Sequence, residues 1–159
     1  MARRSAGILL YRLAGREPEV LLVHPGGPFW ARRDAGVWSI PKGEYAEGED
    51  PRAAAVREFQ EELGSAPPAD DAMLELGTIT QRSGKVVTAF AVAGDLDTDE
   101  MHSNTFAMEW PARSGQTQEF PEVDRAGWFA PSEAREKLVP AQAELVDRLL
   151  EHLGKPRAS

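Results

Sequence analysis

Several acidic side chains and one arginine are set at fixed offsets within a short segment of this chain. The segment covers residues 43–64, reads GEYAEGEDPRAAAVREFQEELG, and contains Glu49 and Arg57. Its most closely spaced acids are Glu58, Glu61 and Glu62. Carboxylate oxygens suit a hard divalent cation such as Mg²⁺, which takes a few carboxylates together with phosphate oxygens of a substrate. The spacing therefore predicts a divalent metal site.

A helix must bring these carboxylates together, and the sequence supplies its start and its end. Pro51 suits the first helical position, Asp50 can cap the exposed amides, and Gly64 can end the helix. At helical spacing, one apolar stripe is formed by Ala55, Phe59 and Leu63. The glutamates fall on an arc beside that stripe, so we expect them at the rim of a cleft.

The like charges on this helix require compensation. Carboxylates three or four residues apart destabilise an isolated helix by roughly 0.2–0.5 kcal/mol per pair. Arg57 can pair with Glu61, but one arginine cannot neutralise three carboxylates. A bound cation would offset the remaining charge. The alternative is a charged helix face that water solvates, and spacing alone leaves both interpretations open.

The loop before the helix favours the metal site. Residues 38–43 read WSIPKG, in which Pro41 and Gly43 favour a turn. Lys42 can meet a phosphate as a point charge, and the carbonyl of Gly43 can ligate a metal ion. Glu49 lies where it could hold Arg57 or an outer water molecule. The loop and the helix together predict a site for a metal ion and a phosphate group.

The whole run resembles the Nudix box, the signature of the Nudix hydrolase family. In that box a glycine is followed at fixed offsets by a glutamate and then by Arg-Glu-apolar-any-Glu-Glu-any-Gly-apolar. The matching residues are Gly43, Glu49, Arg57, Glu58, Phe59, Glu61, Glu62 and Gly64. Only Ser65 departs, at a position where the family has an apolar residue. The run at 38–43 and the stretch at 119–129 also resemble the family, so the likeness extends over nearly the whole chain.

The resemblance implies a role for each residue of the box. It implies that the Gly43 carbonyl and the box glutamates hold Mg²⁺, with Mn²⁺ as an alternative ion. Arg57 and Glu49 would orient the ligands, and Arg57, Glu58 and Glu61 would form the catalytic set. A late acidic residue often completes the metal shell in this family, and we assign Glu122 to that role. The general base stays open among Glu58, Glu119 and Glu122.

Cations and aromatics outside the box are candidates for substrate binding. Lys42, Arg4 and Lys85 are candidates for drawing in a polyphosphate. The loop at 24–36 is rich in Gly, Pro and Arg and carries Phe29 and Trp30, which suggests a lid that stacks on a base. The alternative is that the two aromatics attach the loop to the body of the protein.

The composition bounds the class of protein. A chain of 159 residues with 42% apolar and 28% charged residues predicts one globular domain, taken as 1–153, with a frayed tail at 154–159. No apolar run approaches a membrane span, and a net charge of −8 disfavours binding to duplex nucleic acid. The absence of cysteine excludes disulfides and thiolate chemistry, and the default expectation is a cytoplasmic location. The oligomeric state stays open.

The hydrophobic pattern predicts alternating strands and helices. Strands are expected at 5–13, 19–24, 74–81, 86–93 and 105–110, with an irregular loop at 111–121. Proline opens two further helices at 131 and 140, and Leu145, Leu149 and Leu153 share one face of the second. By resemblance, the fold class is α/β, a Nudix-type α/β/α sandwich with a central mixed β-sheet.

The expected function is Mg²⁺-dependent hydrolysis of a phosphoanhydride bond. The substrate would be a nucleoside diphosphate linked to another moiety, of the nucleoside triphosphate or dinucleoside polyphosphate type. Residues 38–43 resemble those of diadenosine polyphosphate hydrolases, which usually continue with histidine where this chain has Glu44. The alternative is a noncatalytic Nudix-like domain that senses a nucleotide or binds a partner. The particular nucleotide and the number of metal ions stay open.

Overall fold

The structure is a computed structural model that describes residues 3–15, 17–68 and 73–156. Its strands are β1 (Arg4–Ala14), β2 (Glu17–Pro25), β3 (Lys42–Glu44), β4 (Leu74–Thr80), β5 (Val86–Ala93), β6 (Thr105–Glu109), β7 (Thr117–Pro121) and β8 (Val123–Phe129). Its helices are α1 (Pro51–Leu63), α2 (Pro131–Lys137) and α3 (Ala143–His152), with short 3₁₀ turns η2 (Thr98–Glu100) and η3 (Pro140–Gln142).

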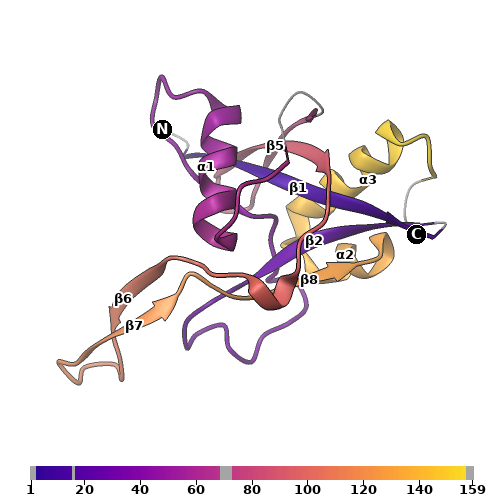
Figure 1. The fold of residues 1–159 in the computed structure, drawn as a ribbon. Coiled ribbons are helices and arrows are strands. Elements are labelled where there is room, and N and C mark those ends of the chain that lie inside the picture. The colour runs from indigo at the N-terminus through magenta and orange to yellow at the C-terminus, as the bar shows by residue number, and fades with distance from the viewer. Residues whose placement is uncertain (1–2, 16, 69–72, 157–159) are drawn as a thin grey trace.

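A mixed sheet forms the centre of the molecule (Figure 1). Among the described residues, its strands follow the order β4-β5-β1-β2-β8, and β3 pairs with β1. Strands β1 and β5 run parallel, whereas the other pairs are antiparallel. Helix α1 covers one face of this sheet, and α2 and α3 cover the other. The predicted α/β/α sandwich with a central mixed sheet is confirmed.

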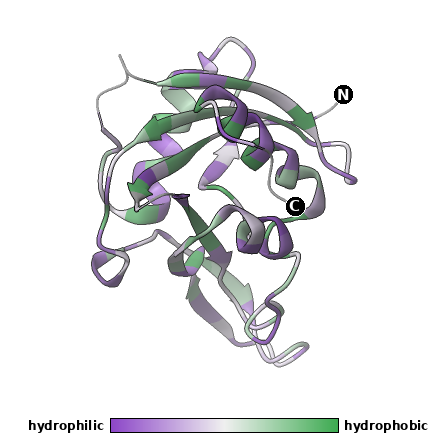
Figure 2. Cartoon of the chain, turned by 90° about the vertical axis from the view of Figure 1, so that its right-hand side faces the viewer, coloured by the Kyte–Doolittle hydropathy of each residue, from purple (hydrophilic) through white to green (hydrophobic). Residues whose placement is uncertain are grey.

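The core consists of two layers because side chains alternate along each strand. Along β1, Ala6, Ile8 and Leu10 pack toward α1, whereas Leu9 and Tyr11 pack toward α2 and α3. In Figure 2 the central strands carry most of the hydrophobic colour, while the helices are mixed. The sheet is therefore buried on both faces, which holds α1 firmly against β1.

Helix α1 begins and ends where its capping residues predict. The Asp50 side chain accepts a hydrogen bond from the backbone N–H of Ala53 at 3.1 Å. Gly64 takes a left-handed conformation with φ of 80°, and a Cβ there would lie 2.6 Å from the carbonyl oxygen of His102. The expected apolar stripe of Ala55, Phe59 and Leu63 is fully buried.

The structure corrects two segments that were expected to be loops. Residues 117–121 of the expected loop at 111–121 form β7, which pairs with β6 in a separate two-stranded sheet. This strand is mostly exposed, so it has no apolar alternation from which it could be predicted. Residues 42–44 form β3, which pairs with β1. This strand is too short to show an alternation of apolar and polar residues in the sequence.

The other elements agree with the expectations to within a few residues. The helix expected from Pro140 begins as η3 and continues as α3, with Leu145 and Leu149 buried and Leu153 packed against the core. None of the helices in the described part of the chain is long and apolar enough to cross a membrane. In the expected tail, Gly154 ends a turn, and residues 157–159 lie outside the described ranges. The domain limits and the fraying of the tail stay predictions.

Candidate functional site

Strand β3 and helix α1 meet at the edge of the sheet, where Gly43 contacts Glu58. Gly43 pairs with Ala6 of β1, which fixes β3 under the helix. A Cβ built on Gly43 would lie only 2.0 Å from the Glu58 carboxyl carbon. A side chain at position 43 would therefore displace the Glu58 carboxylate from its present place. The first glycine of the box and its first helical glutamate are in direct contact.

Arg57 bridges three acidic side chains beside this contact. Its Nη2 donates to the two carboxylate oxygens of Glu49 at 3.1 and 3.3 Å. Its Nη1 donates to Oε1 of Glu58 at 2.9 Å and lies 3.7 Å from Oε1 of Glu61. Glu49 also accepts from the backbone N–H of Ala46. Glu49 thus holds Arg57, which is one of the two roles that the sequence predicted for it. Arg57 in turn holds Glu58.

A chain of backbone hydrogen bonds brings Glu122 to the same place. The N–H of Asn104 donates to the carbonyl of Glu61 at 2.9 Å, and the N–H of Glu122 donates to the carbonyl of Asn104 at 2.8 Å. The N–H of Gly26 then donates to the carbonyl of Glu122 at 2.9 Å. Gly26 admits no side chain, since its Cβ would lie 1.9 Å from the carbonyl oxygen of Pro121. Glu122 is therefore clamped between the end of α1 and the end of β2.

The four glutamates at this corner carry more negative charge than their surroundings offset. Burial raises the pKa of Glu62 to about 8, with repulsion from Glu58 and Glu122 added to it and attraction to Lys42 opposing it. Burial followed by repulsion from Glu61 raises the pKa values of both Glu58 and Glu122. We define Glu58, Glu61, Glu62 and Glu122 as the acidic cluster. Burial is the largest cause of these raised pKa values, and repulsion within the acidic cluster adds to it.

Two lysines lie beside the acidic cluster. Burial and repulsion from Lys85 lower the pKa of Lys42, whereas Glu62, Glu44 and Glu58 oppose that change. The backbone N–H of Lys42 also bonds the Glu62 carboxylate. The ammonium of Lys85 lies 3.9 Å from Oε2 of Glu44. The structure thus brings the predicted cations Lys42 and Lys85 together at the edge of the sheet.

A cavity of about 270 Å³ adjoins Lys42 on the α2 and α3 side of the sheet. Its lining includes Trp30 and Lys42. The loop that carries Trp30 is fastened by His24, whose Nε2 donates to the carbonyl of Arg33 at 2.6 Å, and whose Nδ1 lies 2.8 Å from the Asp124 carboxylate. Trp30 stays 39% exposed, and the Arg33 guanidinium lies 5.7 Å from the centroid of its ring.

Two of the residues considered for the site, Phe29 and Glu119, make their contacts on the β6–β7 hairpin, and a third, Arg4, is separated from Lys42 by the sheet. The ring of Phe29 makes an edge contact with Trp110, with 5.7 Å between the centroids, so Phe29 attaches the loop to the β6–β7 hairpin. Glu119 lies on β7, where its carboxylate accepts from the hydroxyl of Thr105 at 3.3 Å. Arg4 begins β1 with an exposed side chain, and strand alternation directs it to the α1 face of the sheet, whereas Lys42 lies on the other face.

Sequence reasoning missed two glutamines that line the cavity. Gln81 directly follows β4, and Gln142 is the last residue of η3. Both line the cavity, and a hydrogen bond of 2.9 Å joins their side chains. They are 61 residues apart, and neither lies in a motif. The sequence therefore offers no signal for either residue, because only the fold brings them together.

The acidic cluster fits a divalent cation by its chemistry. Its donors are all oxygens, burial followed by repulsion among them raises the pKa values of Glu58 and Glu122, and Arg57 is shared by only two of them, Glu58 and Glu61. In the described part of the chain, no group of three acidic or histidine side chains is already arranged to hold a metal ion, and the Glu58 carboxylate accepts a hydrogen bond from Arg57. Binding of an ion would therefore require these side chains to move.

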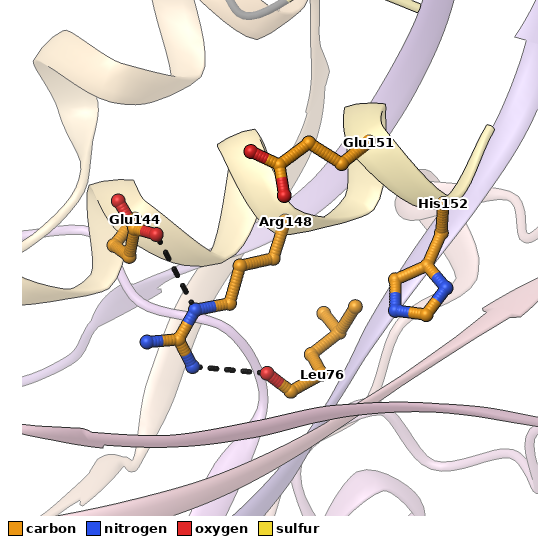
Figure 3. A pocket seen from close by; sticks show the side chains of 5 residues that line it. All are labelled: Leu76, Glu144, Arg148, Glu151 and His152. Atoms are coloured by element: carbon orange, nitrogen blue, oxygen red, sulfur yellow. Dashed lines mark hydrogen bonds and ion pairs between the residues drawn. The ribbon is translucent and has the colours of Figure 1, made fainter. Parts of the chain in front are cut away.

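A second cavity, of about 440 Å³, lies between α3 and β4 and shares no lining residue with the acidic cluster. Figure 3 shows Arg148 reaching across it from α3, between Glu144 and the carbonyl of Leu76. Arg148 also donates to the carbonyl of Thr78 at 2.8 Å. Gly77, between these two carbonyls, has φ of 83° and marks a bulge in β4. Arg148 therefore stabilises the backbone at this bulge.

The fold is thus that of an α/β protein in which the acidic cluster lies beside two lysines, Lys42 and Lys85. Comparison with known proteins gives the family. The family model described as NUDIX domain matches residues 1–149, and the chain belongs to this family.

Curated relatives match the chain over short stretches. An RNA pyrophosphohydrolase of Roseobacter denitrificans is 48% identical over 46 residues, which are 28% of this chain and 29% of that protein. An RNA pyrophosphohydrolase of Gluconacetobacter diazotrophicus is 36% identical over 69 residues, which are 40% of this chain and 37% of that protein. The chain thus spans about a third of the length of these relatives.

Solved structures match the fold over most of the chain. A C. elegans Ap4A hydrolase, solved as a binary complex, has a TM-score of 0.61 and 20% identity, over 94% of this chain and 98% of that one. The NUDIX domain of Shewanella oneidensis NrtR, complexed with ADP ribose, has a TM-score of 0.64 and 17% identity, over 96% and 89%. At these identities the likeness supports the fold.

Proposed function

We propose that this protein is a cytoplasmic, divalent-metal-dependent pyrophosphohydrolase that cleaves a phosphoanhydride bond in a nucleoside diphosphate linked to another moiety. The observation that carries the proposal is the acidic cluster, in which four carboxylates gather beside the partly buried Lys42 and two of them, Glu58 and Glu61, share Arg57. The names of the relatives support it, since they include RNA pyrophosphohydrolases and an Ap4A hydrolase.

The acidic cluster and the Gly43 carbonyl would hold Mg²⁺ or Mn²⁺. When bound, the ion would supply positive charge against the phosphate oxygens and make a nearby water more acidic. Lys42 and Lys85 would bind phosphate oxygens of the substrate, on either side of the bond that breaks. Arg57, held by Glu49, would keep Glu58 and Glu61 in place.

The hydrolysis needs one water molecule and one proton acceptor. The water oxygen forms a bond to phosphorus, and the bridging P–O bond breaks toward the leaving phosphate. The water gives one proton to a carboxylate, and Glu58 or Glu122 is in position for this role because both belong to the acidic cluster. Glu119 is not part of that cluster, since its carboxylate bonds the hydroxyl of Thr105 on the hairpin.

The proposal is tested by a substrate panel with Mg²⁺ or Mn²⁺. The panel contains ATP, GTP, Ap4A, ADP-ribose and a short RNA with a 5′-triphosphate, and ³¹P NMR identifies the products. Hydrolysis in ¹⁸O-labelled water shows which phosphorus is attacked. We expect Glu62→Gln to reduce kcat/KM by roughly 100-fold or more. Glu133→Gln on the exposed surface of α2 removes the same charge and should leave kcat/KM unchanged. Wild-type turnover by Glu62→Gln, or no hydrolysis of any compound, would remove the assignment.

A further inference from the structure

The cavity beside Lys42 contains a hydrogen-bond network whose donors and acceptors are fully determined. Gln142 is completely buried, and its Oε1 accepts from the backbone N–H of Ile40 at 2.9 Å. Its Nε2 donates to the hydroxyl of Ser39 at 3.1 Å and to Oε1 of Gln81 at 2.9 Å. The hydroxyl of Ser39 donates in turn to the carbonyl of Ile40 at 2.7 Å.

The backbone of Ile40 sets the orientation of both amides. A backbone N–H can only donate, so the Gln142 atom that faces it must be oxygen. The Gln142 NH₂ group then faces Ser39 and Gln81, so the Gln81 atom opposite must also be oxygen. The Gln81 NH₂ group makes no hydrogen bond with another described side chain or backbone group. Gln81 therefore offers the two hydrogens of its NH₂ group to a ligand in the cavity, whereas its Oε1 already accepts from Gln142.

The surroundings of Gln81 suit a flat aromatic ring. Trp30 lines the same cavity with a partly exposed ring, and Val37 and Val139 supply apolar walls. Lys42, which lies at the cavity and is coupled to the acidic cluster, connects this space to the phosphate region. A nucleotide could thus place its base in the cavity and its phosphates at the lysine.

We propose that this cavity holds the base of the nucleotide and that Gln81, oriented by Gln142, selects guanine over adenine. Guanine presents two adjacent acceptors, O6 and N7, whereas adenine presents the N7 acceptor beside an amino donor. The two hydrogens of the Gln81 NH₂ group match the guanine edge, and the adenine amino group would face donors. The inference deepens the proposed function, since it assigns the base specificity of the same site.

The test measures binding without hydrolysis. Titration calorimetry with GDP and with ADP, in buffer containing EDTA, gives the ratio of the two dissociation constants. We expect wild type to bind GDP roughly tenfold more tightly than ADP. Gln81→Met, which removes the donors at similar size, should bring the ratio close to one. Gln81→Glu, which presents acceptors, should shift the ratio toward ADP. Gln116→Glu, an exposed residue on the hairpin, is the charge-matched control and should keep the wild-type ratio.

The outcomes separate this inference from the proposed function. Equal binding of GDP and ADP by wild type, or a wild-type ratio in both Gln81 variants, overturns the base assignment even when the protein hydrolyses nucleotides. A guanine preference that Gln81 variants remove supports the base assignment even when no compound in the panel is hydrolysed. Thermal unfolding of each variant shows that it is folded, which is expected because Gln81 is only partly buried at the end of β4.

Discussion

Helices α1 and α3 pack on opposite faces of the same sheet, and each buries an acidic residue in a different way. In α3, Asp147 is 5% exposed and forms an ion pair with Arg135 of α2. In α1, Glu58 is 9% exposed, but its partner Arg57 is shared with Glu49 and Glu61. The acid of α3 has its own cation, whereas the acids of α1 compete for one.

This difference separates a structural ion pair from a functional site. Asp147 of α3 has an arginine partner that it does not share with the acidic cluster. In the acidic cluster, burial raises the pKa values of Glu58, Glu62 and Glu122, and repulsion between the carboxylates adds to this effect. This arrangement is unfavourable for the folded chain on its own, and the cation that the proposed function requires would offset it.

The largest effect on the α1 side is expected from Gly43→Ala. The new Cβ would lie within 2.0 Å of the Glu58 carboxyl carbon, so this carboxylate must move. We expect kcat/KM in the substrate panel to fall roughly 100-fold, because small displacements of catalytic groups have effects of this size. Gly48→Ala serves as a control for the loss of a glycine, since nothing lies within 4 Å of its Cβ, although its φ of 87° costs some stability. Activity of Gly43→Ala near that of wild type would contradict the contact as a functional feature.

On the α3 side we expect an effect on stability alone. Asp147→Asn leaves Arg135 without its charged partner, and the free energy of unfolding should fall by about 2 kcal/mol, since Arg135 is partly exposed and can hydrate. Urea denaturation measures this change. The kcat/KM of the folded variant should equal that of wild type. If Asp147→Asn lost much of its activity but none of its stability, the α3 side of the sheet would also contribute to activity.

The sequence predicted the parts of the site that depend on local spacing. Helix α1, its caps and its apolar stripe follow from residues within one segment, and all are confirmed. The proximity of Glu122 depends on the hydrogen bonds through Asn104, which join segments far apart in the chain. The pairing of Gln81 with Gln142 depends in the same way on the packing of β4 against η3. Such contacts leave no periodic signal, so Glu122 and Glu119 could be separated only by the structure.

A smaller effect should appear in the pH dependence of stability. In the folded chain the pKa of Glu62 is about 8, whereas the ordinary pKa of a glutamate is 4.5. Between these values the folded chain binds more protons than the unfolded chain, so the free energy of unfolding falls as pH rises. We expect a loss of about 2 kcal/mol across this window, because water still screens the partly buried side chain.

Urea denaturation with EDTA at pH 5 and pH 8 measures this dependence. Glu62→Gln should be less sensitive to pH and more stable than wild type at pH 8, although it is expected to lose activity. Saturating Mg²⁺ should also reduce the dependence in wild type, because the ion competes with the proton. An equal fall in stability for wild type and Glu62→Gln would show that other groups cause it.

The smallest effect is expected from Glu49→Gln, which tests how the shared arginine is held. The substituted amide could still accept one hydrogen bond from Arg57, but the charge that draws Arg57 away from Glu58 would be lost. Arg57 should then pair more strongly with Glu58 and Glu61, and the apparent affinity for Mg²⁺ should fall roughly three- to tenfold. The Mg²⁺ dependence of kcat measures this shift, and kcat at saturating Mg²⁺ should stay near that of wild type. A loss of kcat that excess Mg²⁺ does not restore would instead show that Glu49 takes part in the chemical step. In that case the difference between the acids near α1 and the Asp147–Arg135 ion pair would include Glu49 as well as the acidic cluster.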